Sequence, residues 1–411
     1  MGKSDDKHLG SGVRDSPNRL KLGTFATNAS HAGSMTSVEG HFETTWDSVS
    51  ELAAIADGAG MEAIVSVGRW RGHGGDVDFN GSSYETFTWA AGIGAETKTA
   101  SVFATCHMPT IHPIRAAKQA VTVDHISRGR FAINLVCGWY RSEMETFGAP
   151  LMEHDLRYDY AEEWIEIVKR LWTSDEEVNF RGKFFTIKNA VSQPKPIQVP
   201  LPPIMQAGGS PRGRDFAAKH ADLAFLGLRP DLVGAAEEIA SLRALARDKY
   251  GREIQTWSTC YGVIGDTDDE AERFLRYYVE EKGDWKSADN FLAEAGLNTG
   301  SLGAHGLTPA DFESLRYHFV AGVGGFPLVG TPETITRRIS QVVDVGIDGV
   351  LLVFARYRQD LGRFVDEVIP LLCRSGLRES GSSVVKGIGH MPGDGQHLDM
   401  AIGDGLREPL A

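Results

Sequence analysis

The sequence lacks the features that mark membrane, secreted and nucleic-acid-binding proteins. No apolar run in its 411 residues approaches the roughly 18 residues that a membrane-spanning helix requires. The first residues, MGKSDDKHLGSGVRDSPNR, contain no apolar segment of the kind found in a secretory signal, which predicts a cytoplasmic protein. A net charge of -13 offers no positive face for nucleic acid, so neither a membrane nor a nucleic-acid partner is expected.

Cysteine is also scarce, and one common nucleotide-binding motif is missing. The four cysteines, Cys106, Cys137, Cys260 and Cys373, lie far apart without metal-type spacing, which predicts reduced thiols and neither a disulfide nor a metal site. No Gly-x-Gly-x-x-Gly follows the first expected strand, which argues against a doubly wound dinucleotide-binding sheet. Hydrophobic residues at 42% and charged residues at 24% are typical of a globular protein.

Short apolar segments alternate with amphipathic ones along most of the chain. This alternation predicts a (β/α)8 TIM barrel with insertions, because repeated β-α units of this length form a closed parallel sheet. Expected strands cover residues 20–25, 62–67, 100–106, 131–136, 204–207, 222–226, 254–264 and 349–354, and an expected hairpin covers 178–187.

The expected domain organisation has four parts. Residues 1–19 are predicted to be a disordered leader, and residues 20–375 to form the barrel. Within the barrel, the glycine-rich segment 283–329 loses periodicity and is interpreted as a lid-like insertion with a mobile loop. Residues 376–411 form a tail that is either disordered or laid over a neighbouring subunit.

Three local patterns are candidates for a binding site at the barrel mouth. Asn134 is a polar residue in an otherwise apolar strand, where a parallel barrel places ligand-binding groups, although it also fits a satisfied core asparagine. Gly208, Gly209 and Ser210 follow a strand and open a helix, which suits either a phosphate site or a simple capped turn. Arg157 is a second phosphate candidate or a solvated helix charge.

These residues belong to a set of motifs through which the sequence resembles the bacterial luciferase-like flavin monooxygenases, and within them the enzymes acting on pyrimidines and dimethylsulfone. The resemblance extends over nearly everything between Leu20 and Leu372. The motifs, each weak alone and specific together, are His112-Pro113 with Ala116-Ala117-Lys118-Gln119, Asp124 to Arg130, Asn134 to Trp139, Glu153-His154-Asp155-x-Arg157-Tyr158, Gln206 to Ser210, and Gly330-Thr331-Pro332-Glu333.

The resemblance implies a barrel that binds reduced FMN at its mouth and receives it from a separate NAD(P)H:flavin reductase. The family's flavin-binding positions fall on Gly68, Arg69, Asn134, Glu143, Arg157, Tyr158 and Ser210, with Gly208 and Gly209 beside the phosphate. Gly68-Arg69 differs from the pair in the pyrimidine enzyme. Thr105 and Asn134 match the pair that holds dioxygen near the flavin N5, and Trp139 is expected close by. A homodimer or homotetramer is expected.

The predicted function is a monooxygenase that uses reduced FMN and dioxygen on a small heteroatom-containing molecule, with cleavage of a carbon-heteroatom bond. The resemblance leaves open a C4a-peroxide or an N5 adduct as the oxygenating species, and the substrate. A deazaflavin-dependent hydride-transfer enzyme is one alternative, against which Thr105 and Asn134 weigh; a non-catalytic flavin-binding protein is the other. Polar candidates for substrate contact are Thr27, Asn28, His31, Arg69, Arg71, His73, His107 and His305.

Overall fold

Eight parallel strands close into a barrel in the computed structural model, which describes residues 12–148, 151–297 and 307–379. The strands follow the chain around the barrel, and β8 pairs with β9, β9 with β11, and β11 with β1, which completes the ring. The barrel strands are β1 (Lys21–Phe25), β2 (Ala63–Val65), β3 (Ser101–His107), β4 (Phe131–Val136), β7 (Ile204–Ala207), β8 (Leu223–Phe225), β9 (Gln255–Ile264) and β11 (Gly349–Phe354). The predicted (β/α)8 fold is confirmed.

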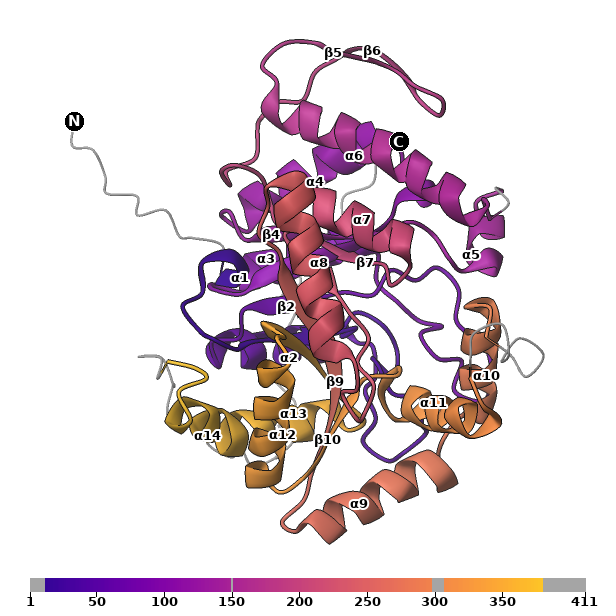
Figure 1. Ribbon diagram of the computed structural model, residues 1–411, viewed down its shortest axis with the longest axis vertical. Coiled ribbons are helices and arrows are strands. Elements are labelled where there is room, and N and C mark those ends of the chain that lie inside the picture. Colours follow the sequence, from indigo (N-terminus) through magenta and orange to yellow (C-terminus); the bar gives the residue numbers. More distant parts are fainter. Residues whose placement is uncertain (1–11, 149–150, 298–306, 380–411) are drawn as a thin grey trace, which may run out of the picture.

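Helices surround this ring and supply the outer half of the core (Figure 1). Every residue of β3 is buried, as expected for a strand covered by side chains on both faces. The helices are α1 (Gly12–Asp15), α2 (Trp46–Gly58), α3 (Thr86–Glu96), η1 (Met108–Thr110), α4 (Pro113–Ile126), α5 (Arg141–Thr146), α6 (His154–Thr173), α7 (Pro211–His220), α8 (Ala235–Tyr250), α9 (Asp268–Arg276), η2 (Tyr277–Glu281), α10 (Trp285–Glu294), α11 (Pro309–Gly322), α12 (Pro332–Asp344), α13 (Tyr357–Arg363), η4 (Phe364–Val368) and α14 (Ile369–Arg374). None of the helices in the described ranges is long and apolar enough to cross a membrane.

The segment preceding β1 closes the end of the barrel at which the strands begin, which we call the lower end. Val13 in α1 is fully buried in the cluster of side chains that fills the barrel interior, and Arg14 forms a salt bridge with Asp222 at 3.3 Å. The prediction of a disordered leader is therefore wrong for residues 12–19, because one apolar side chain and one arginine dock this short helix onto the strand starts. Residues 1–11 lie outside the described residues.

The other end of the described chain meets the same region. Leu377 accepts a hydrogen bond from the Leu20 amide at 2.9 Å, and Arg378 pairs with the buried carboxylate of Glu62 at 2.8 Å. The start of the predicted tail thus packs against its own barrel, while residues 380–411 lie outside the described part of the chain.

Two insertions leave the regular alternation. The predicted hairpin is present as β5 (Val178–Arg181) and β6 (Thr186–Ala190), which lie outside α6 (Figure 1). In the described parts of the segment 283–329, residues 283–297 and 307–329, α10 and α11 pack together and β10 (Phe326–Gly330) pairs with the end of β9, so these parts are more ordered than predicted.

The glycines near the end of α11 were interpreted as a hinge, but Gly322 has a packing role. A Cβ on Gly322 would lie 2.3 Å from the Cβ of Tyr261, so glycine allows α11 to pack directly on β9. The glycines at 300, 303 and 306 fall outside the described residues.

Candidate functional site

A cavity of about 340 Å³ opens at the carboxyl ends of the barrel strands, and we call it the central cavity. Barrel enzymes place their active sites at this end. Its walls are mainly apolar, with only a few polar side chains, a composition typical of small-molecule and cofactor sites. The aromatic residues of the lining are Phe25, Phe79, Trp139, Phe225, Phe291 and Phe319, and its polar residues are Arg69, Asn80, Thr105, His107, Asn134 and Thr259.

Thr105 and Asn134 are neighbours in this cavity. They are register partners on β3 and β4, and Asn134 Nδ2 donates a hydrogen bond to Thr105 Oγ1 at 3.1 Å. The Thr105 hydroxyl in turn donates to the Ser66 carbonyl, while the Ser66 hydroxyl accepts from the Thr105 amide at 2.9 Å. The threonine proton thus goes to the Ser66 carbonyl, and the Thr105 hydroxyl oxygen, as acceptor, holds the Asn134 amide in one orientation.

Arg69, His107 and Glu143 form a buried charged cluster beside that pair. The Glu143 carboxylate lies 3.7 Å from Arg69 Nη1 and 2.9 Å from His107 Nδ1, and it accepts a hydrogen bond from the Trp70 amide at 2.6 Å. Burial alone would raise the pKa of Glu143, but His107, Arg69 and the Trp70 amide together lower it below its ordinary value. Glu143 lines neither cavity, so it holds Arg69 and His107 from behind.

An aromatic group joins α10 to the loop after β2. The His73 ring lies between Tyr140 and Phe291, with ring centroids at 4.8 and 4.6 Å, and Trp139 contacts Phe291 at 4.9 Å. Both His73 ring nitrogens are buried without a hydrogen-bond partner, and burial together with nearby Arg69 lowers the pKa of His73 to about 2. A neutral ring therefore forms part of the wall beside the cavity.

The predicted phosphate segment forms the start of α7. Ser210 is the N-cap of this helix, and its hydroxyl accepts the Gly213 amide at 3.0 Å. Tyr158 in the first turns of α6 faces the segment, because its hydroxyl lies 3.0 Å from where a Cβ on Gly208 would stand. Burial raises the pKa of Tyr158, which keeps its phenol a neutral hydrogen-bond donor.

Several buried polar side-chain atoms have no hydrogen-bond partner in the described residues. They include Asn134 Oδ1, Arg157 Nε and both side-chain amide atoms of Gln206. A Cβ on Gly208 would lie 2.6 Å from Gln206 Nε2, so this amide lies directly beneath the helix start. Buried polar groups in folded proteins are normally paired, so these atoms fit a ligand with a polar tail.

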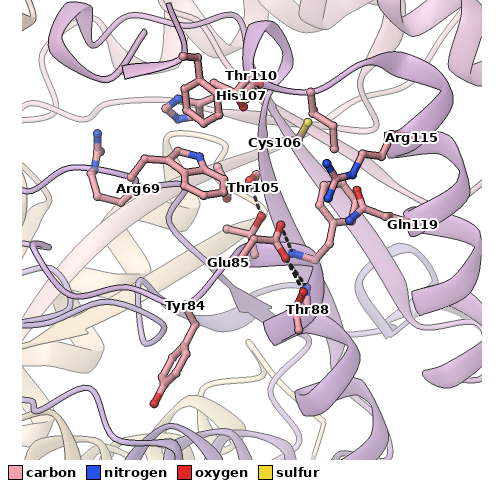
Figure 2. A pocket seen from close by; sticks show the side chains of 16 residues that line it. Arg69, Tyr84, Glu85, Thr88, Thr105, Cys106, His107, Thr110, Arg115 and Gln119 are labelled. Carbon is pink, nitrogen blue, oxygen red and sulfur yellow. Dashed lines mark hydrogen bonds between the residues drawn. The ribbon is translucent and has the colours of Figure 1, made fainter. Parts of the chain in front are cut away.

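A second, smaller cavity of about 210 Å³ lies next to the central one, and we call it the side pocket (Figure 2). It extends between the starts of α3 and α4, where Glu85, Arg115 and Gln119 line it. The Glu85 carboxylate caps α3, accepting the Phe87 and Thr88 amides at 3.1 and 2.8 Å. The residues shared by the two cavities are Gly68, Arg69, Thr105 and His107.

The structure separates the predicted site residues into two groups. Gly68, Arg69, Thr105, Asn134 and Trp139 line the central cavity. The second group, which lies on neither lining, consists of Glu143, Arg157, Tyr158, Gly208, Gly209 and Ser210. Tyr158, Gly208, Gly209 and Ser210 lie at or near the start of α7 beyond the cavity residue Ala207, whereas Arg157 donates to the Gly138 carbonyl.

Other expected substrate contacts have structural roles. Asn28 is fully buried, and its side chain binds the backbone of Val67 and Tyr84. The His31 ring stacks on His41 at 4.7 Å, and Arg71 is exposed away from both linings. His305 lies outside the described residues.

Three contributing residues were not singled out from the sequence. Ser66 orients Thr105, Phe291 closes one side of the central cavity, and Gln206 lies under the α7 start. Gln206 belongs to a recognised motif, which could have drawn attention to it. No comparable local signal exists for Ser66 or Phe291.

Across the described ranges, no group of three or more histidine, cysteine, aspartate or glutamate side chains is placed to hold a metal ion.

The fold is a (β/α)8 barrel, and an aromatic cavity with a few converging polar groups lies at the carboxyl ends of its strands. Together these features define a barrel enzyme with a small-molecule site. The chain belongs to the luciferase-like monooxygenase family, whose family model matches residues 20–349. The predicted family and the predicted enzyme class, a monooxygenase, are thereby confirmed.

Two curated relatives and two solved structures illustrate this membership. The chain is 31% identical to FMNH2-dependent dimethylsulfone monooxygenase of Pseudomonas putida, over 80% of this chain and 89% of that protein. It is 30% identical to pyrimidine monooxygenase RutA of Cronobacter turicensis, over 87% and 94% of the two chains. Structures of riboflavin lyase with modified FMN and riboflavin (TM-score 0.78, 24% identity) and long-chain alkane monooxygenase (0.76, 23%) each cover 88% of this chain and 93% of their own, and they support the fold.

Proposed function

We propose that this protein uses reduced FMN and dioxygen to oxygenate a small heteroatom-containing organic molecule, with cleavage of a carbon-heteroatom bond. The observation that carries the proposal is the Thr105 and Asn134 pair, fixed by Ser66 at the edge of a largely apolar cavity. Relatives named FMNH2-dependent dimethylsulfone monooxygenase and pyrimidine monooxygenase support both the cofactor and the reaction class.

The flavin ring fits the central cavity, and its phosphate fits the start of α7. Gly68 supports this placement, because a Cβ there would meet Thr105 and His107 at 3.2 and 3.1 Å, so glycine leaves the cavity floor flat. The amides of Gly208 and Gly209, the Ser210 hydroxyl and the helix dipole of α7 suit a phosphate. Arg157 and Tyr158 would add a charge and a phenol donor.

Bound reduced flavin supplies the electrons that activate dioxygen, and the protein controls the surroundings of that reaction. Asn134 is positioned to orient an oxygen atom with the Nδ2 proton that Thr105 does not use. Trp139, Phe291 and Phe319 exclude water from the cavity, which protects the reaction from hydrolysis and proton leakage.

The flavin must arrive already reduced from elsewhere. Relatives named FMNH2-dependent dimethylsulfone monooxygenase support a separate NAD(P)H:flavin reductase as partner. A cytoplasmic location and assembly into a homodimer or homotetramer remain predictions, the latter measurable by light scattering during size-exclusion chromatography.

Oxygen consumption tests the proposal directly. Purified protein should consume dioxygen with reduced FMN, and one member of a panel of sulfones, sulfonates, nitrogen heterocycles and halogenated aromatics should gain one atom of ¹⁸O from labelled dioxygen. Oxidation of a reduced deazaflavin by a substrate without dioxygen would instead favour the hydride-transfer alternative. Flavin binding without any turnover across the panel would favour a non-catalytic flavin-binding protein.

A further inference from the structure

The central cavity contains very few groups able to exchange a proton. Of the described residues that line it, only Arg69 and His107 have titratable side chains, and arginine keeps its proton at all accessible pH values. His107 also lines the side pocket (Figure 2). Because it belongs to both linings, its ring lies at the boundary between the two cavities.

We propose that His107 is the catalytic residue that delivers a proton to the departing oxygen atom, and that the side pocket is its connection to solvent. This inference rests on the proposed monooxygenase function. Each turnover consumes one dioxygen: the O–O bond breaks, one oxygen atom joins the substrate, and the other leaves as water. Two electrons and one proton of that water would come from the reduced cofactor, and the second proton comes from solvent through His107.

The geometry around His107 favours transfer from one nitrogen. Nδ1 lies 2.9 Å from the Glu143 carboxylate, which is fully buried and carries a lowered pKa, so this ionised partner fixes the ring and leaves Nε2 as the nitrogen that can exchange a proton. No described residue forms a hydrogen bond with Nε2. The adjacent Cδ2 lies 3.1 Å from where a Cβ on Gly68 would stand, which brings this side of the ring to the cavity floor.

The opposite side of the boundary supplies a polar route. The side pocket is lined by Glu85, Thr88, Arg115 and Gln119 as well as by the aromatic residues Trp70, Tyr84, Phe87 and Phe147, so it places charged and polar groups on the far side of His107. Water in this pocket can exchange protons with His107 without entering the central cavity. The charged groups facing the histidine are Arg69 and Glu143 at the boundary and Glu85 and Arg115 across the pocket.

Kinetics of His107→Gln test the catalytic role, because glutamine retains a polar side chain but cannot serve as a general acid. With the substrate identified by oxygen incorporation, kcat should fall about a hundredfold, within the range of acid-base catalysis. KM and FMN affinity should stay within about twofold of wild type. Added imidazole should restore part of kcat in His107→Ala, since the truncated side chain leaves space at the boundary of the two cavities.

A matched control and a second measurement separate catalysis from folding and from the proposed function. His125→Gln, at the far end of α4, should retain wild-type kcat. In flavin-free protein with labelled histidine rings, the nuclear magnetic resonance signal lost in His107→Gln should shift on adding FMN and in Glu143→Gln. This signal reports the placement of His107 even if no substrate is found.

Three results would overturn the inference. One is wild-type kcat in His107→Gln, and another is a His107 ring signal that FMN leaves unchanged. The third is a loss of kcat matched by an equal loss of FMN affinity or folding, without imidazole rescue, because that pattern identifies a structural residue. If wild type incorporates no labelled oxygen although FMN shifts the signal, the proposed function fails while the placement of His107 beside the flavin stands.

Discussion

The Thr105 hydroxyl has two structural partners, and this changes how its role is understood. Its proton goes to the Ser66 carbonyl and its lone pair accepts Asn134 Nδ2 at 3.1 Å. In the proposed function, Thr105 therefore acts on the reaction by fixing the amide of Asn134, a residue that lines the central cavity.

Thr105→Val should slow the oxygen reaction by about a hundredfold, or roughly 3 kcal/mol of barrier, as for loss of one preorganised donor. Valine keeps the shape but leaves Asn134 free to rotate. Stopped-flow oxidation of the reduced-flavin complex measures this rate. Thr256→Val removes another buried hydroxyl near the barrel floor and should cost stability without slowing oxidation. Equal oxidation rates in wild type and Thr105→Val would refute the role.

Individual residues were predictable where a motif marks them. Asn134 stood out because an amide interrupts an apolar strand, and Thr105 because the family pattern has a threonine there. The buried contact between Glu143 and His107 was not predictable, because their proximity depends on how α5 packs against the end of β3. Asn28 and His31 were candidates for substrate contact, but the loop after β1 folds inward and uses them internally.

Helix α10 is attached to the loop after β2 by a small number of contacts. Asn290 donates to the His73 carbonyl at 2.7 Å, Ser287 donates to the Gly74 carbonyl, and the Val77 amide donates to Asp284 at 2.8 Å. Phe291 of the same helix both packs on His73 and lines the central cavity. The order of this helix is thus linked to the closure of the cavity.

His73 should make this closure sensitive to acid. Burial lowers the pKa of His73 to about 2, so the closed state accommodates only the neutral ring. The stabilisation of the closed state by this ring is therefore complete above the ordinary pKa value of 6.5. As the pH falls below 6.5, the ring is protonated when it is exposed but stays neutral when it is buried. This difference in proton binding favours the open state of α10. At pH 4.5 the closed state should lose about 2.7 kcal/mol, or about a hundredfold in its population ratio.

Hydrogen exchange of residues 285–294, corrected for intrinsic rates, measures that opening. His73→Phe preserves the aromatic packing without a titratable group, and its opening should change far less between pH 6.5 and 4.5. The same pH response in both proteins would show that another group controls α10.

At the level of elements, sequence periodicity located the barrel strands to within a few residues. It failed where local composition and tertiary packing disagree. Segment 283–329 looked irregular because its glycines suggested a loop, yet Gly322 is required for contact with Tyr261 and Phe326–Gly330 completes a pairing with β9. Helix α1 is only four residues long, too short for any periodic signal.

The whole molecule is closed at its lower end by a buried ion pair. Glu62 is 5% exposed and interacts with Arg378 at 2.8 Å and with the side chains of Ser16 and Asn18 at 2.8 and 2.6 Å. This carboxylate links the segments before β1 and after α14 to the start of β2. Its location opposite the cavity separates its effect on stability from any effect on the site.

Arg378→Ala should lower the free energy of unfolding by about 3 to 5 kcal/mol, because it leaves a buried carboxylate without its counter-charge. Denaturant unfolding measures the loss, and FMN affinity should be unchanged. Arg19→Ala breaks an exposed pair with Asp344, whose side chains are 61% and 71% exposed, and should cost less than about 1 kcal/mol. Similar losses in the two variants would show that the buried pair has no special weight.

The proximity of residues 18 and 379 has a topological consequence. The Glu379 amide donates to Asn18 Oδ1 at 2.7 Å, so a linker of a few residues could join these positions and make the barrel covalently continuous. New ends could then be cut at the exposed turn near Gly182, between β5 and β6. Such a circular permutant would keep every strand pairing of the barrel, and both of its termini would lie on the outer hairpin beside α6.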